Sequence, residues 1–287
     1  DTEISGTAVS YLRIVATGFP FIFLAAACTG IYNAAGLSKI PFYVSGSGLI
    51  MNMVLDPLFI FGFGMGTNGA ALANSVSGAN ETVLAIFIYY LKKKNRLFGG
   101  FPFLIRLKSR YSRRIFQLGL PVALLNSLFA VINLMMARTA STYGGHIGLT
   151  TMTAGGQIEA IAWNTSQGFS TALSTFVAQN FAARKKERVL GAYHTTLKMT
   201  ALFGIFCTLL FVFFGSEVFS LIIPEKAAYE AGGVFLRIDG YSMLFMMLEI
   251  TMQGLFYGTG RTLPPAIISI TFNSLRIPMA IGLTAMG

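Results

Sequence analysis

The chain has 287 residues, of which 54% are hydrophobic and 11% are charged, whereas about 25% of the residues in an average soluble domain are charged. This composition excludes an ordinary soluble enzyme. The formal net charge of +10 is typical of a membrane protein whose cytoplasmic loops collect Lys and Arg, so we do not expect nucleic acid as a partner.

Long stretches without any Asp, Glu, Lys or Arg recur along the chain. The ranges 14–38, 115–137 and 161–183 are three of them, and each exceeds the roughly 18 apolar residues that indicate a membrane-spanning helix. Apolar runs divided at charge clusters and at Gly or Pro turns predict eight spans. In chain order these are 11–35, 41–63, 69–91, 115–138, 151–181, 192–214, 235–257 and 265–287.

The connections between these spans alternate in charge. One set, made of 36–40, 92–114, 182–191 and 258–264, holds 15 of the 21 Lys and Arg residues. The opposite connections contribute Lys226 alone. Because positive loops stay in the cytoplasm, we expect a multi-pass protein of the plasma membrane with the first set of loops on its cytoplasmic side.

An internal repeat links the first and seventh spans. Moving the chain by 224 residues without gaps places Tyr11 on Phe235 and gives nine identities over the 35 positions up to Ser45. Apolar composition alone would give about two or three. The matched pairs include Gly36 with Gly260 and Pro41 with Pro265, at places where a helix has to end.

The repeat predicts an all-α membrane protein built from two parallel six-helix halves, of which eight of twelve helices are present. Three helices before the chain and one after it are then expected, in a protein of roughly 430–450 residues. The predicted organisation has three parts: 1–91 as helices four to six, in the N-terminal lobe; 92–114 as a basic cytoplasmic linker; and 115–287 as helices seven to eleven, in the C-terminal lobe.

With these helices and motifs, the chain resembles the multidrug and toxic compound extrusion (MATE) transporters. The motifs that carry the resemblance follow one another in order over almost the whole chain: Tyr11-Leu-Arg-Ile, Gly36 to Pro41, Asn52-Met-Val-Leu-Asp56-Pro57, Gly69 to Asn74, Gly119-Leu-Pro121, Val177-Ala-Gln179-Asn180, Leu236-Arg-Ile238 and Gly258-Thr-Gly260. Asn74 stands where the family usually has Thr.

The resemblance implies a secondary antiporter that exports organic cations, drugs or aromatic compounds in exchange for sodium ions or protons. It also implies that Asn52, Asp56 and Asn74 contribute to a cation site completed by an acidic residue on the missing first helix. A lipid-linked oligosaccharide flippase of the same superfamily is the alternative. We expect no enzymatic activity, no cofactor besides the coupling ion, no metal beyond a sodium ion at Asp56, and a monomer in the bilayer.

Carboxylates inside spans need compensation, because each costs at least about 2.5 kcal/mol at a helix centre. Asp56 lies one turn from Asn52, so both side chains share a face, and carboxylate with amide oxygens suits a hard cation or a proton. Alternatively, Asp56 caps or kinks the helix before Pro57. Glu81 either lines the cavity below this site or faces a neighbouring helix as a hydrogen-bonded acid.

The second half offers a different set of charges. Glu249 and Arg276 lie at similar depths in adjacent spans, which predicts a structural ion pair. Arg276 occupies the repeat position of Asn52, and Ala280 that of Asp56, which disfavours a second matching cation site. Glu159 and Asp239 lie nearer the outer surface and are candidates for attracting cationic substrates.

Overall fold

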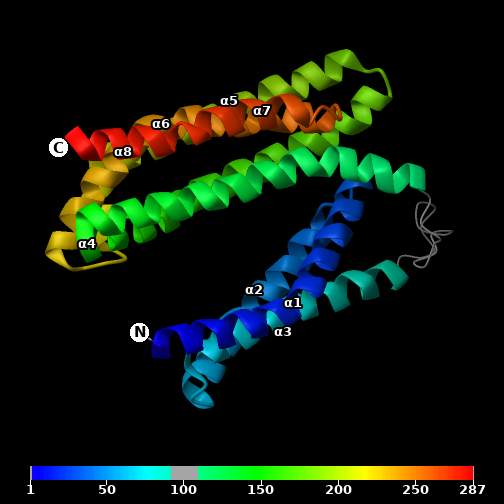
Figure 1. Cartoon of the computed structure of the whole chain (residues 1–287). Helices are drawn as coiled ribbons and strands as arrows, with labels where there is room; N and C mark the ends of the chain where they lie inside the picture. Colours follow the sequence, from blue (N-terminus) through cyan, green and yellow to red (C-terminus); the bar gives the residue numbers. More distant parts are fainter. Residues whose placement is uncertain (1, 92–108, 287) are drawn as a thin grey trace. The chain divides into compact units, whose positions relative to one another are not determined.

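The computed structural model describes residues 2–91 and 109–286, and these fold into helices (Figure 1). The chain divides into two compact units, 1–106 and 107–287. Six of the described helices are long and apolar enough to cross a membrane. The protein is therefore an all-α, multi-pass membrane protein.

Unit 1 consists of α1 (Thr2–Ala34), α2 (Lys39–Pro57), the short π-helix η1 (Leu58–Gly62) and α3 (Gly66–Leu91). Helix α3 packs against both α1 and α2. Two hydroxyl groups join α3 to α1: Thr82 Oγ1 donates to the carbonyl of Phe21 at 2.6 Å, and the Tyr32 hydroxyl donates to the carbonyl of Ala85 at 2.7 Å. Such bonds and close small-residue contacts hold helices together where water provides no hydrophobic driving force.

Unit 2 consists of α4 (Ser109–Ala182), α5 (Lys186–Ser220), α6 (Lys226–Gly258), α7 (Leu263–Ser274) and α8 (Arg276–Met286). Helix α6 packs against α4, α5 and α7. Gly254 and Gly258 let α6 approach α4 closely, since a Cβ at either position would lie 2.6 Å from the carbonyl oxygen of Ser170 or Ser174. Glycine thus provides the close approach that the apolar core of a membrane protein uses.

The eight predicted spans map onto the described helices once two helix breaks are taken into account, although six of these helices have the length and hydropathy of a span. The backbone of α4 leaves the helical region at Gly145, with φ 57° and ψ −147°, so α4 contains the predicted spans 115–138 and 151–181. The predicted span 265–287 is divided between α7 and α8 at Leu275. The predicted connection over 139–150 is present but shorter than expected: the chain turns at Gly145, and its flanking residues are helical.

Pro278 explains the break at Leu275. A proline ring clashes with the carbonyl of the residue four positions earlier and supplies no N–H for it, and that residue is Ser274, the last of α7. The repeat position of Pro278 is Val54, and α2 runs without interruption through Val54 to Pro57. The two copies of the repeat therefore diverge at the residues that follow Ser274.

Before that point the repeat is reproduced in the backbone. Adding 224 to the bounds of α1 gives those of α6, and adding it to the first residue of α2 gives the first residue of α7. The turns agree as well: the N–H of Leu37 donates to the carbonyl of Tyr32 at 2.9 Å, and the N–H of Arg261 donates to the carbonyl of Phe256 at 3.0 Å. The repeat found in the sequence is thus also a structural repeat.

Candidate functional site

In unit 1 the candidate cation site lies on the last two turns of α2. Asn52 and Asp56 are both half-buried, and their spacing of four residues puts them on one face. The Nδ2 atom of Asn52 is buried and has no hydrogen-bond partner in the described part of the chain. The amide is therefore not held by a neighbouring helix there, which leaves it available to a ligand beside the Asp56 carboxylate.

The helix changes its geometry directly after Asp56. Pro57 ends α2, and the chain continues as the π-helix η1, in which the N–H of Phe63 donates to the carbonyl of Leu58 at 2.9 Å. Single π-helical turns are rare and occur frequently at functional sites. This π-helical turn was not expected from the sequence, although Pro57 marks the place where the α-helical bonding fails.

Asn74 lies on α3, and its side chain is exposed. No hydrogen bond found in the described part of unit 1 joins it to Asn52 or Asp56. The grouping of Asn74 with those two residues therefore stays a prediction.

Glu81 belongs to α3, and its side chain contacts α2. Its carboxyl group fills the space that a side chain at Gly48 of α2 would need, and it forms a side-chain hydrogen bond with Ser45 of the same helix. One residue earlier, Asn80 Nδ2 donates to Ser47 Oγ at 3.4 Å. Of the two alternatives left open by the sequence, this geometry favours an acid that is hydrogen-bonded to a neighbouring helix.

Unit 2 gathers three charged side chains from three helices. Glu159 of α4 and Asp239 of α6 are half-buried, and their negative charges repel each other. The positive charge of Arg276, at the start of α8, acts on both carboxylates. The Oδ2 atom of Asp239 is buried and has no hydrogen-bond partner among the described residues, so this carboxylate keeps an oxygen free to receive a cation or a donor.

Among the described residues, no ion pair joins Glu249 to Arg276. Instead, Glu249 Oε1 accepts hydrogen bonds from Ser269 Oγ at 2.7 Å and from Gln253 Nε2 at 3.1 Å. The prediction assumed one straight helix over 265–287, whereas the break at Leu275 makes Arg276 the first residue of α8. Depth counted along an unbroken helix therefore does not locate Arg276, and its pairing with Glu249 stays a prediction.

Comparison with known proteins decides the family. The MatE family model matches residues 1–58 and 121–281, which include Asn52, Asp56, Glu159, Asp239 and Arg276. The chain belongs to the MatE family.

Two named proteins are similar to the chain over nearly its whole length. The probable multidrug resistance protein NorM of Thermotoga maritima is 27% identical over 289 residues, covering 97% of this chain and 60% of NorM. The multidrug export protein MepA of Staphylococcus aureus strain N315 is 21% identical over 277 residues, covering 96% of this chain and 60% of MepA. The chain thus spans about three fifths of the length of these relatives.

Solved MatE-type structures share the fold. The structure described as the outward-facing conformation of a multidrug resistance MATE family transporter of the MOP superfamily matches with a TM-score of 0.85 at 22% identity. The match covers 96% of this chain and 61% of the solved one.

Proposed function

We propose that the full-length MatE protein containing this chain is a secondary antiporter that exports organic cations or drugs in exchange for sodium ions or protons. Membership of the MatE family and the multidrug resistance or export names of NorM and MepA support export of small molecules. The observation that carries the coupling mechanism is Asp56, a half-buried carboxylate one turn from the unpartnered amide of Asn52 and next to a π-helical turn.

In the proposed mechanism, binding of the coupling ion neutralises the negative charge of Asp56. An ionised carboxylate in the membrane is costly, and a bound sodium ion or proton removes most of that cost. If the cation binds with different affinity in the outward- and inward-facing states, its binding shifts the balance between them. The irregular backbone at Pro57 and η1 supports this role, because single π-helical turns occur frequently at functional sites.

In the proposed cycle, Glu159 and Asp239 attract the cationic substrate. Their two carboxylates and the single cation of Arg276 carry a formal charge of −1 when all three are ionised, which favours a monovalent organic cation over an anion. A flippase for a pyrophosphate-linked sugar would need a cationic cavity. Arg276, whose side chain is exposed, is a cation that acts on these two carboxylates, so this arrangement supports drug export instead.

The proposed orientation puts the segments 36–40, 92–114, 182–191 and 258–264 on the cytoplasmic side of the plasma membrane; of these, 92–108 lies outside the described residues. The excess of Lys and Arg in these loops supports this assignment. Cysteine labelling from either side of intact cells tests it in a background that lacks the two native cysteines, Cys28 and Cys207, which are buried and free.

The experiment that tests the function uses the full-length protein in liposomes loaded with a fluorescent organic cation. A sodium gradient and a proton gradient are imposed separately. We expect one gradient to drive dye movement and its collapse by the matching ionophore to stop it. Dye movement at the same rate with and without the gradients would contradict the proposal. So would an absence of dye movement together with transfer of a lipid-linked pyrophosphate.

A further inference from the structure

A second polar site lies at one end of unit 2, away from the carboxylates of the spans. A cavity of about 700 Å³ opens where α4 ends, α5 begins and α6 ends. Four cationic side chains line it, from two separate turns: Arg184, Lys185 and Lys186 from the α4–α5 turn, and Arg261 from the α6–α7 turn.

None of the described residues that line this cavity is a carboxylate. Glu187 lies in the first turn of α5 and is exposed, but it is not part of the wall. Within the described ranges, none of the four cations forms an ion pair; the pair that is found, Lys226 with Glu230, belongs to the opposite end of α6. The cavity thus concentrates positive charge that the described protein does not neutralise.

The rest of the wall is apolar. Leu190 and Phe181 are exposed, with 43% and 54% of their surfaces accessible, and Leu255 and Phe256 of α6 complete this side. A cationic rim at the end of membrane spans with an apolar wall below it matches an amphiphile, since the phosphate of a lipid lies at the rim and its acyl chain along the spans.

The cavity is built into the packing of the unit. Val189, at its base, is buried in a cluster with Leu173 and Val177 of α4, against which Leu255 packs. The α4–α5 turn is fixed by the N–H of Lys185, which donates to the carbonyl of Asn180 at 2.9 Å. The two cationic turns are therefore held at a defined separation by buried contacts rather than by the charged side chains themselves.

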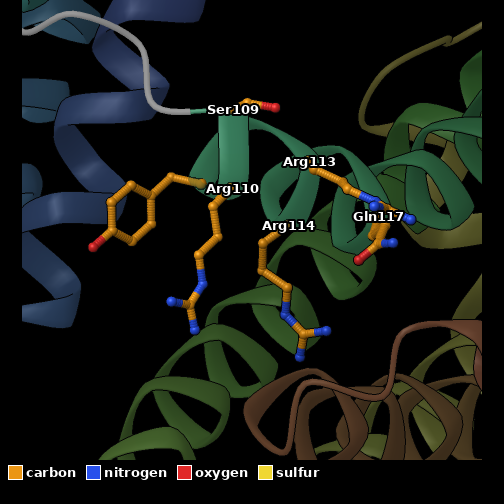
Figure 2. Close-up of a pocket in the computed structure, with 6 residues that line it drawn as sticks. Ser109, Arg110, Arg113, Arg114 and Gln117 are labelled. Carbon is orange, nitrogen blue, oxygen red and sulfur yellow. The ribbon is translucent and has the colours of Figure 1, made fainter.

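A neighbouring basic surface extends this site. Residues 109–117, the start of α4, line another cavity, in which Arg110 and Arg114 point the same way (Figure 2). Arg114 reaches the α6–α7 turn, because one of its guanidinium nitrogens lies 3.9 Å from where a Cβ on Gly260 would be. Gly260 precedes Arg261, so Arg114 of the second cavity lies close to the turn that carries a cation of the first.

We propose that the cavity between the α4–α5 and α6–α7 turns binds the phosphate of an anionic phospholipid, with an acyl chain along Leu190 and Phe256. Each cation close to an anionic lipid contributes attraction that falls off within a Debye length. A zwitterionic lipid brings a cationic headgroup of its own into the same rim and is disfavoured. The site is independent of which ion drives transport.

The test compares binding of phosphatidylglycerol and phosphatidylcholine to the purified full-length protein by native mass spectrometry. The pocket variant Lys185→Gln with Arg261→Gln removes one cation from each turn. The matched control, Arg188→Gln with Lys226→Gln, also removes two cations; Arg188 stacks on Phe176, 5.6 Å from the ring centre, and Lys226 lies at the other end of α6. The charge-conserving variant Lys185→Arg with Arg261→Lys tests whether positive charge at these two positions is sufficient for lipid binding.

We expect the wild-type protein, the control and the charge-conserving variant to prefer phosphatidylglycerol, and the pocket variant to bind it on the order of tenfold more weakly. Equal binding by the pocket variant and the control, or equal binding of both lipids by the wild type, would overturn the proposal. So would equally tight binding of glycerol 3-phosphate in solution, which lacks the acyl chain.

A second measurement uses the wild-type protein, so its result does not depend on whether the variants fold. Photocrosslinkable phosphatidylglycerol is added to the wild-type protein in nanodiscs, and the labelled peptides are identified. Labels within 181–190 and 255–261 support the site. Labelling confined to other segments overturns it, including the case in which another part of the full-length protein covers this cavity.

Discussion

Gly36 and Gly260 lie 224 residues apart and adopt the same left-handed backbone conformation, with φ +74° and +73°. Each ends a helix of 33 residues, α1 or α6, and each turn leads into the helix that carries Pro41 or Pro265. A side chain with a Cβ costs roughly 1–2 kcal/mol in this conformation, so glycine at both positions follows from the repeated turn.

We expect Gly260→Ala to destabilise the protein by roughly 1–2 kcal/mol, because alanine adopts the left-handed region poorly. Thermal unfolding of the purified protein in detergent measures the effect as a lower Tm. Gly30→Ala is the matched control, since Gly30 is helical and nothing lies within 4 Å of the added Cβ; its Tm should be unchanged or higher. Equal effects of the two substitutions would contradict the role assigned to the turn.

Because Glu81 contacts α2 at Gly48, we expect a larger side chain at Gly48 to destabilise the protein. A methyl group there would overlap the Glu81 carboxyl group, so Gly48→Ala should cost about 1–3 kcal/mol. Adding Glu81→Ala should recover much of this loss by emptying the space. Gly46→Ala, two residues away and with nothing within 4 Å of the added Cβ, serves as the control, and a neutral Gly48→Ala would show that Glu81 points elsewhere.

The partners of Arg276 can be distinguished by double-mutant cycles. If Arg276 compensates Asp239, Arg276→Gln leaves two carboxylates without their cation, and Asp239→Asn should relieve that loss. We expect a coupling energy of about 1–3 kcal/mol between Arg276 and Asp239 from unfolding measurements. The cycle with Glu249→Gln should be additive within about 0.5 kcal/mol, since the Glu249 carboxylate is bonded to Ser269 and Gln253. The reverse pattern would restore the pairing expected from the sequence.

The course of the helices could be predicted from the sequence, because the apolar runs and turn residues act locally. Gly36 and Gly260 mark helix ends by their own conformational freedom, and the repeat transfers the bounds of α1 to α6. The connection expected at 139–150 is shorter than its polar and glycine residues suggested, because such residues permit a turn without requiring one and the chain leaves the helix at Gly145 alone.

The grouping of charges could not be predicted in the same way. Depth along a span says how far a residue lies from the surface but not which neighbour it faces, and Glu81 faces Ser45 and Gly48 because of how α3 is rotated against α2. The predicted pairing of Arg276 with Glu249 assumed an unbroken helix, and Pro278 interrupts that helix at Leu275. That proline was a usable signal, since its effect on Ser274 depends on sequence spacing alone.

The measurement that tests the central claim most directly is gradient-driven export of an organic cation by the full-length protein with Asp56→Asn. This substitution keeps the size of the side chain and removes the charge that a sodium ion or proton would neutralise. We predict that coupled export falls at least about tenfold while membrane insertion and Tm persist, and that Glu81→Gln, at a carboxyl group hydrogen-bonded to Ser45 of α2, stays within about twofold of the wild type. Undiminished coupled export by a normally inserted Asp56→Asn protein would contradict the assignment of Asp56 as the coupling residue.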